Sequence, residues 1–320
     1  MKERNHVIDW MRVIGLVGIF FAHCSLPLPV HYFRSFDVVL LFFVSGISFG
    51  LSSFTWSKEN YWNYLKKRII RLVIPTWIYL AVFFLVFHFI PGYDFTTPIM
   101  IKSFLFTAGG ILFVWVYRIF IGTAITTPLL TRLLDNVNNK AIIFGSAGVL
   151  LLNDCIYHII LRQGFQEMIV DLFSYIVTFT VGYGIITFLG ARFIHFTRKE
   201  QVLFSLYYGA IFLILALFHQ GAHLEGFKYP PQTYYVSYGL AWSGGLYLLL
   251  SRYVHKPNSI IEWISRYSMR IYLAHIAVYY LLFPVVHGGL LQFIVFFGTS
   301  CLLVLFYNSI EKYLRKNNNG

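Results

Sequence analysis

The chain has 320 residues, of which 58% are hydrophobic and only 12% are charged, and its mean hydropathy is +0.67. This composition excludes an ordinary soluble domain, whose surface needs many more charged side chains. A net charge of +12 would be compatible with binding to nucleic acid. The positions of the basic residues along the chain indicate a different reason for this charge.

Apolar runs long enough to cross a bilayer recur along the whole chain. We therefore expect an all-α, polytopic integral membrane helix bundle with about ten transmembrane helices. Residues 1–320 are expected to form a single transmembrane domain without an appended soluble domain. The segment 104–134 is either one long helix or a broken one. The predicted spans are 8–26, 36–54, 72–90, 105–131, 141–160, 169–190, 202–219, 232–251, 267–285 and 289–311.

The first span contains Arg12 and His23, which are eleven residues apart. Eleven helical residues end about 20° beyond three full turns, so both side chains should share one helix face, about 16 Å apart along the axis. A cation and an imidazole are costly in hydrocarbon, so they should face a protein-lined or aqueous cavity. The alternative is an arginine that reaches the interface and a histidine bonded within the bundle. Asp9, three residues before Arg12, is placed to orient the guanidinium.

The lysine and arginine residues predict the orientation in the membrane. With the N-terminus inside, the cytoplasmic segments hold nineteen of them and the outer loops hold four, while Arg12 and Arg118 lie within spans. This is a strong excess of positive charge on one side, and an even number of spans places both termini in the cytoplasm. Topology and anionic lipid thus account for the net charge, and no nucleic-acid partner is predicted.

Other polar residues leave alternatives open. Arg118 is a second intramembrane cation, which either contacts a substrate or pairs with Asp154 or another buried carboxylate. His219 and His223 have the i, i+4 spacing of zinc ligands. The glutamate of a metalloprotease helix is missing there, and Gly221 lies between the two histidines. No metal site is therefore predicted.

Three further side chains, Asn153, Asp154 and His158, lie along the fifth span and are candidates for a cavity lining. His275 could contact the same cavity, but the favoured interpretation is a buried, hydrogen-bonded structural role.

Four segments carry a family resemblance. IDWMRVIGLVGIFFAH resembles an opening Asp-x-x-Arg followed, after ten residues, by His, and FDVVLLFFVSG is similar to a Phe-Phe-x-x-Ser-Gly helix. KKRIIRLVIPTW resembles an Arg-x-x-Arg motif that leads into the third helix, and SRYSMRIYLAH is similar to a Ser-x-x-x-Tyr-Leu-x-His signature. Together they resemble the membrane acyltransferase-3 family. The resemblance extends from about Arg4 to Phe283 and is weaker in the middle.

Members of this family O-acylate surface polysaccharides and related glycans. The resemblance implies an acyltransferase in a bacterial cell membrane that acts on a glycan or lipid-linked glycan, with acetyl as the default acyl group. Acyl-CoA, here acetyl-CoA, would be a co-substrate, and no permanently bound cofactor is implied. The alternative is a transporter of polysaccharide or lipid-linked glycan, or another non-catalytic protein on the same helices. Transporters often have repeated halves, and the sequence contains no internal repeat that we can detect.

The chemistry of individual residues agrees with the resemblance. Arg68 and Arg71 are spaced i, i+3 at the expected cytoplasmic boundary. Together with Arg12 they are candidates to bind the phosphates of acyl-CoA. The alternative is that this basic stretch only sets the orientation of the chain in the membrane. His23 is the candidate catalytic group, either as a general base or as a carrier of the acyl group. Tyr229 precedes two prolines, resembles a loop of the family, and could shape the acceptor entrance. Asp9 and Arg118 are supporting candidates.

The predicted topology can be tested with reporter fusions. A reporter fused after Ile90 should report the outer side, and one fused after Gly320 should report the cytoplasm, because the nineteen-to-four charge split fixes the orientation. The same side for both fusions would contradict an even number of spans in this arrangement.

Overall fold

The computed structural model describes residues 4–162 and 173–318, and all regular structure in them is helical, which confirms the all-α prediction. The elements are α1 (His6–Ala22), α2 (Leu28–Phe33), η1 (Arg34–Phe36), α3 (Asp37–Gly50), α4 (Lys58–His88), α5 (Thr97–Phe104), α6 (Val116–Leu133), α7 (Asn139–Arg162), η2 (Ser174–Thr178), α9 (Phe179–Phe193), α10 (Arg198–Phe218), η3 (Leu224–Phe227), α11 (Thr233–Tyr253), α12 (Ser259–Leu282) and α13 (Gly289–Asn318).

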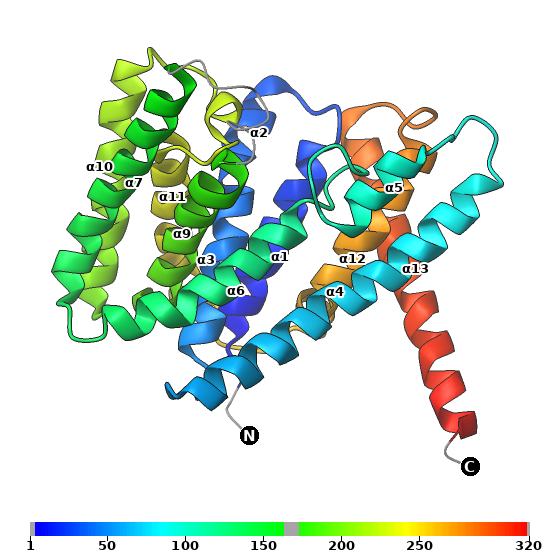
Figure 1. Cartoon of the computed structure of the whole chain (residues 1–320), viewed down its shortest axis with the longest axis horizontal. Coiled ribbons are helices and arrows are strands. Elements are labelled where there is room, and N and C mark those ends of the chain that lie inside the picture. The colour runs from blue at the N-terminus through cyan, green and yellow to red at the C-terminus, as the bar shows by residue number, and fades with distance from the viewer. Residues whose placement is uncertain (1–3, 163–172, 319–320) are drawn as a thin grey trace.

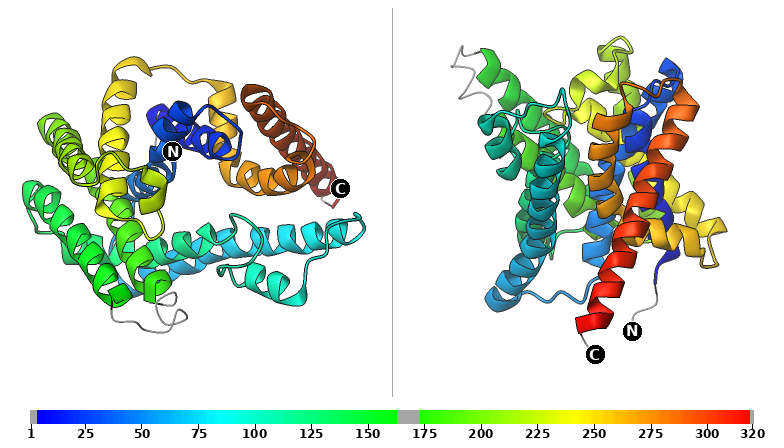
Figure 2. Two further views of the ribbon diagram at one scale, coloured as in Figure 1. Left: turned by 90° about the horizontal axis from the view of Figure 1, so that it is seen from above. Right: turned by 90° about the vertical axis from the view of Figure 1, so that its right-hand side faces the viewer.

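The helices form an inner and an outer group (Figures 1 and 2). Within the inner group α1 packs against α3 and α12, α3 packs against α9, and α11 packs against α3. Most of the segment 28–50 is buried, 72%, whereas only 17% of α10 and 22% of α13 are buried in their apolar stretches. The outer helices expose large apolar side chains such as Leu217 and Phe306, as a surface in contact with lipid requires.

Six segments of the described chain are long and apolar enough to cross a membrane: 28–50, 58–88, 139–162, 176–193, 198–218 and 289–314. The chain is therefore a multi-pass membrane protein, but the predicted count of ten is not reached by length and composition alone. Inner helices fall short for identifiable reasons: α1 has only 17 residues, and α12 contains Glu262, Arg266 and Arg270. A helix surrounded by other helices does not need to be apolar on all sides.

α1 begins and α13 ends at the same end of the bundle (Figures 1 and 2). α1 runs from that end toward the opposite one, and His23 follows it directly as its C-terminal cap. Successive long helices run alternately up and down, and α4 crosses the others obliquely (Figure 1).

The predicted span 105–131 is broken. α5 ends at Phe104, residues 105–115 form no continuous helix, and α6 begins at Val116. Phe106 and Phe113 have positive φ angles of 56° and 70° in this segment, which a helix cannot accommodate. Side chains satisfy its backbone instead: the Ser103 hydroxyl accepts the N–H of Ile111 at 2.8 Å, and the Tyr272 hydroxyl donates to the carbonyl of Phe113 at 2.8 Å. Periodicity does not reveal a break that depends on such distant partners.

Two other predicted boundaries change. The span expected at 72–90 begins at Lys58, because the Ser57 side chain caps α4 by accepting the N–H of Asn60, and the helix continues through Pro75. Arg68 and Arg71 therefore lie inside a helix rather than on its flank. The span expected at 169–190 falls partly outside the described residues, and its described part is η2 and α9.

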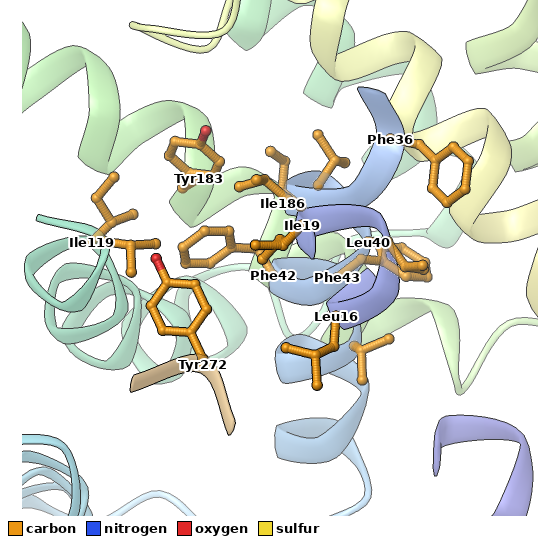
Figure 3. Close-up of a cluster of buried hydrophobic side chains, with 14 of the residues drawn as sticks. Leu16, Ile19, Phe36, Leu40, Phe42, Phe43, Ile119, Tyr183, Ile186 and Tyr272 are labelled. Atoms are coloured by element: carbon orange, nitrogen blue, oxygen red, sulfur yellow. The ribbon is translucent and has the colours of Figure 1, made fainter. Parts of the chain in front are cut away.

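The crossing of α3 and α9 requires glycine on both helices. A Cβ atom at Gly46 would lie 1.9 Å from the carbonyl oxygen of Thr187, and one at Gly190 would lie 2.1 Å from that of Phe43. The close approach lets Phe42 and Phe43 of α3 interlock with Tyr183 and Ile186 of α9 in the buried cluster of Figure 3. The position of α3 at the centre of the bundle depends on this contact.

Replacing Gly46 by alanine should therefore destabilise the protein. The added methyl group meets backbone atoms that cannot move independently, so we expect a loss of at least about 1–3 kcal/mol, seen as a lower melting temperature and a lower yield of monodisperse protein in detergent. Gly148→Ala on α7 is the matched control, since its Cβ would meet no atom within 4 Å. Equal stability of the two variants would contradict the tight crossing.

Candidate functional site

A single cavity brings most of the predicted site residues together. Its volume is about 590 Å³, and it follows α1 from Arg12 to His23. Apolar side chains such as Leu16, Ile19 and Phe42 line its middle. At one end it is lined by Arg12, Arg68, Arg71 and Arg266, and at the other by His23, Arg34, Glu225, Lys228 and Tyr229. The prediction that Arg12 and His23 face one cavity is thus realised in the fold, although His23 is the C-terminal cap of α1 and not a helical residue.

At the arginine end of the cavity, hydroxyl groups hold two guanidinium groups in place. Arg12 donates to the Ser265 hydroxyl of α12 at 2.9 Å and to the Ser48 hydroxyl of α3 at 3.0 Å. Arg68 donates to the Ser45 hydroxyl at 3.0 Å. Neutral acceptors orient a guanidinium without cancelling its charge, so this end of the cavity stays positive and retains free donors.

Asp9 orients Arg12 less directly than its spacing predicted. Its carboxylate accepts hydrogen bonds from Arg4 at 2.6 and 3.0 Å, and the closest approach to Arg12 is 3.9 Å. The Ser265 hydroxyl bridges the two, because it donates to Asp9 at 2.6 Å and accepts from Arg12. The reason is competition: Arg4 offers the carboxylate a two-point contact, which is the stronger arrangement.

At the opposite end, His23 lies among aromatic rings. Its ring centroid is 3.9 Å from that of Phe113, 5.6 Å from that of His275 and 5.9 Å from that of Tyr279. His23 lines the cavity, whereas His275 lies behind it and is only 2% exposed. Nδ1 of His275 is bonded to the backbone carbonyl of Tyr272. The buried, hydrogen-bonded environment expected for His275 is present, and it adjoins the proposed catalytic histidine.

Four charged residues form an ionic cluster beside His23: Arg34, Asp37, Glu225 and Lys228. Arg34 binds Asp37 at 2.7 Å and Glu225 at 2.6 Å. Lys228 lies 3.9 Å from Asp37 and 3.7 Å from Glu225. Burial acts to lower the pKa of Lys228, but the negative charge of Asp37, together with Tyr229 and Glu225, raises it above its ordinary value. The ammonium therefore stays charged while it faces the cavity.

This cluster is not predictable from the sequence patterns. Arg34 and Lys228 are two of the four cations expected in outer loops, yet both are almost fully buried, at 4% and 5% exposure. One signal was available, because Asp37 interrupts the apolar run of the second predicted span. Its partners could not be inferred, since Arg34 and Glu225 are 191 residues apart in the chain.

The remaining candidates divide between the cavity and its surroundings. Tyr229 lines the cavity, with its ring 4.7 Å from that of Trp115 and next to the Lys228 ammonium. Arg118 is half-buried in α6 and is not among the described lining residues. Its suggested partner Asp154 instead accepts the backbone N–H of Thr233 at 2.8 Å. Asn153 donates to a backbone carbonyl in the same region, so the described part of the fifth span contributes no cavity wall.

The paired histidines between α10 and η3 contact aromatic rings. His219 lies 5.0 Å from Tyr234, and His223 stacks on Tyr32 at 3.9 Å. A different group of ligand-type side chains, His6, Asp9 and Glu262, does converge. Arg4 donates to the Asp9 carboxylate and to the backbone carbonyl of Glu262, and His6 lies 3.2 Å from the Glu262 carboxylate, so these side chains form a polar network.

Comparison with known proteins agrees with the arrangement. Residues 5–308 match the family model of the acyltransferase domain that defines the acyltransferase-3 family. No curated protein and no solved structure gives a significant match. Because the matched region covers nearly the whole length and includes both ends of the cavity, the chain belongs to the acyltransferase-3 family of membrane acyltransferases.

Proposed function

We propose that this protein transfers an acyl group, by default acetyl, from cytoplasmic acyl-CoA to a hydroxyl group of a cell-surface polysaccharide or related glycan. The observation that carries the proposal is the single cavity with arginines at one end and His23 at the other. An anionic donor and a neutral acceptor could enter this cavity from opposite sides of the membrane. The reaction would then take place where the two meet.

The arginine end suits the nucleotide part of acyl-CoA. Arg12, Arg68 and Arg71 present guanidinium donors at one opening, and Arg266 adds a fourth positive charge. Phosphate groups are the ligands that such donors bind best. The slim pantetheine arm could pass along the apolar middle of the cavity beside Leu16, since about 16 Å of helix separates Arg12 from His23.

At the other end, His23 would activate the acceptor. In one route the hydroxyl oxygen attacks the thioester carbonyl carbon while His23 takes the hydroxyl proton. The carbon–sulfur bond then breaks, and the CoA thiolate recovers that proton. In the other route a ring nitrogen of His23 attacks the thioester carbonyl carbon first, and the carbon–sulfur bond breaks to release the thiolate. The hydroxyl oxygen then attacks the acyl-imidazole, the carbon–nitrogen bond breaks, and the thiolate takes up the hydroxyl proton. Both routes use an unprotonated ring nitrogen of His23.

Either route develops negative charge on the carbonyl oxygen. Lys228 and Arg34 are the cations beside His23, and the ion pairs of Lys228 are long, at 3.7 and 3.9 Å. An ammonium held this loosely can approach a developing oxyanion, which is usually the most effective form of electrostatic catalysis. Tyr229 would complete the wall against which the acceptor lies.

The same proposal includes the membrane arrangement. The chain would cross the cell membrane of a bacterium ten times, with both termini in the cytoplasm and membrane lipids around the outer helices. The charge split supports it, as does the location of the start of α1 and the end of α13 at one end of the bundle. Acyl-CoA and a glycan or lipid-linked glycan would be its partners, with no bound cofactor, metal or nucleic acid. Asp9 would support Arg12, and Arg118 would act from outside the cavity.

The donor end is tested by removing single arginines. Arg68→Ala or Arg71→Ala should weaken acetyl-CoA binding to the purified protein, measured by calorimetry, because each loses charge-assisted contacts worth about 1.5–3 kcal/mol. Lysine at either position should restore binding only in part. Lys67→Ala is the control, since Lys67 is exposed on the same helix and does not line the cavity. Unchanged acetyl-CoA affinity in both alanine variants would contradict a role in donor binding and would leave the basic stretch with a role in membrane orientation alone.

The catalytic end is tested at His23. His23→Ala and His23→Gln should both abolish the ester-linked acyl groups that mild alkali releases from the surface glycan of producing cells. Glutamine keeps the size of the side chain but cannot take up a proton near neutral pH. Membrane levels and acetyl-CoA affinity should stay near those of the wild type, because the arginine end is about 16 Å away.

His223→Gln provides the matched control, because this histidine packs on Tyr32 outside the main cavity. It should leave acylation unchanged. Substantial acylation by His23→Gln would end both the general-base and the acyl-carrier proposals.

A further inference from the structure

One ring nitrogen of His275 lacks a hydrogen-bond partner in the described part of the chain. Nε2 is buried and no atom of the described residues forms a hydrogen bond with it. Leaving a buried acceptor without a donor costs on the order of 1–3 kcal/mol, so such groups usually serve a purpose. The ring is surrounded by Phe20, Phe113, Tyr272 and His23.

The protonation pattern of His275 follows from its other nitrogen. Nδ1 faces the backbone carbonyl of Tyr272, and a carbonyl oxygen can only accept a hydrogen bond. Nδ1 must therefore carry the hydrogen, and in the neutral ring Nε2 must present a lone pair. His275 is thus a fixed hydrogen-bond acceptor inside the aromatic cluster.

One neighbour can supply the missing donor. Phe20 and Phe113 have no polar atoms in their side chains, and the Tyr272 hydroxyl already donates to the carbonyl of Phe113 at 2.8 Å. His23 remains, as a ring neighbour of His275 that carries an N–H group. The two imidazole planes are nearly parallel, at 22° to each other, and their centroids are 5.6 Å apart. No hydrogen bond joins the two rings in this arrangement, so a bond of about 3 Å between their nitrogens requires the His23 ring to shift and turn its N–H toward Nε2 of His275.

We propose that His275 is a positioning residue that accepts the N–H of one His23 ring nitrogen and so aims the other nitrogen's lone pair into the cavity. The same bond stabilises the imidazolium that forms when His23 takes the acceptor proton. A carboxylate has this role in the Ser-His-Asp triad; here a neutral imidazole takes it, which avoids burying an unpaired negative charge in the bundle. The inference rests on the proposed acyl transfer at His23.

Two substitutions separate this role from a structural one, because each keeps a different nitrogen of the ring. The amide N–H of His275→Asn can still donate to the Tyr272 carbonyl, but nothing replaces the Nε2 acceptor. The amide oxygen of His275→Gln can replace the Nε2 acceptor, while the bond to the carbonyl is lost. Ester-linked acyl groups released from the glycan by mild alkali are measured per amount of monodisperse membrane protein, with acetyl-CoA affinity alongside.

We expect His275→Asn to lower acylation by at least about tenfold at unchanged acetyl-CoA affinity, and His275→Gln to retain several-fold more activity than the asparagine variant. A structural histidine gives the reverse order, because only asparagine keeps the bond to Tyr272. Activity of His275→Asn equal to or above that of His275→Gln would overturn the proposal.

A second measurement needs no acceptor and no turnover. Modification of His23 by diethyl pyrocarbonate, followed by peptide mass spectrometry, reports the nucleophilicity of its ring nitrogen. The rate should fall in His275→Asn relative to wild type, while modification of His223 stays the same. An unchanged rate at His23 would overturn the pairing. Activity retained in His23→Gln would instead refute the proposed function, and the modification rate would still decide the contact between the two histidines.

Discussion

Arginine side chains inside a membrane protein need hydrogen-bond partners, and here neutral serine hydroxyls supply them. Ser48 and Ser265 hold Arg12, and Ser45 holds Arg68. Carboxylates would have bound the guanidinium groups more tightly, but they would also have cancelled the charge that the cavity presents. The two short contacts of the Asp9 carboxylate with a guanidinium go to Arg4, and Arg12 stays 3.9 Å away. The result is a positive, oriented and partly unsatisfied surface, which is expensive without a ligand and favourable with an anionic one.

The serines can do this only because α3 runs through the centre of the bundle. Ser45 and Ser48 lie on either side of the position where α3 crosses α9 at closest approach. Gly46 and Gly190 make that approach possible, since a methyl group on either would overlap a backbone carbonyl of the other helix. The helix α3, which contributes the serine hydroxyls to the cavity, is thus also held in place by close backbone contact with α9. Its fixed position in turn fixes the arginine side chains that bond to those serines.

Local sequence patterns predicted the relative positions of side chains that lie on one helix. The eleven-residue spacing placed Arg12 and His23 along one cavity, and the i, i+3 spacing placed Arg68 and Arg71 together at its mouth. What depends on distant partners was not predictable from one sequence. The cluster of Arg34 with Glu225 joins segments 191 residues apart, and the break before α6 relies on a hydroxyl from α12. Length and hydropathy also fail to identify inner helices such as α1 as membrane spans, because protein rather than lipid surrounds these helices.

The cavity is spanned from end to end by one uninterrupted helix, and an α-helix cannot stretch. Substitutions along α1 change the walls of the cavity, but the distance between its two ends is fixed by the number of residues. Inserting one residue between Arg12 and His23 would advance the far end by about 1.5 Å and rotate it by about 100°, turning the histidine away from its partners. Replacing side chains along this stretch therefore leaves the separation of the two ends unchanged, and a longer donor must be accommodated by widening the cavity sideways.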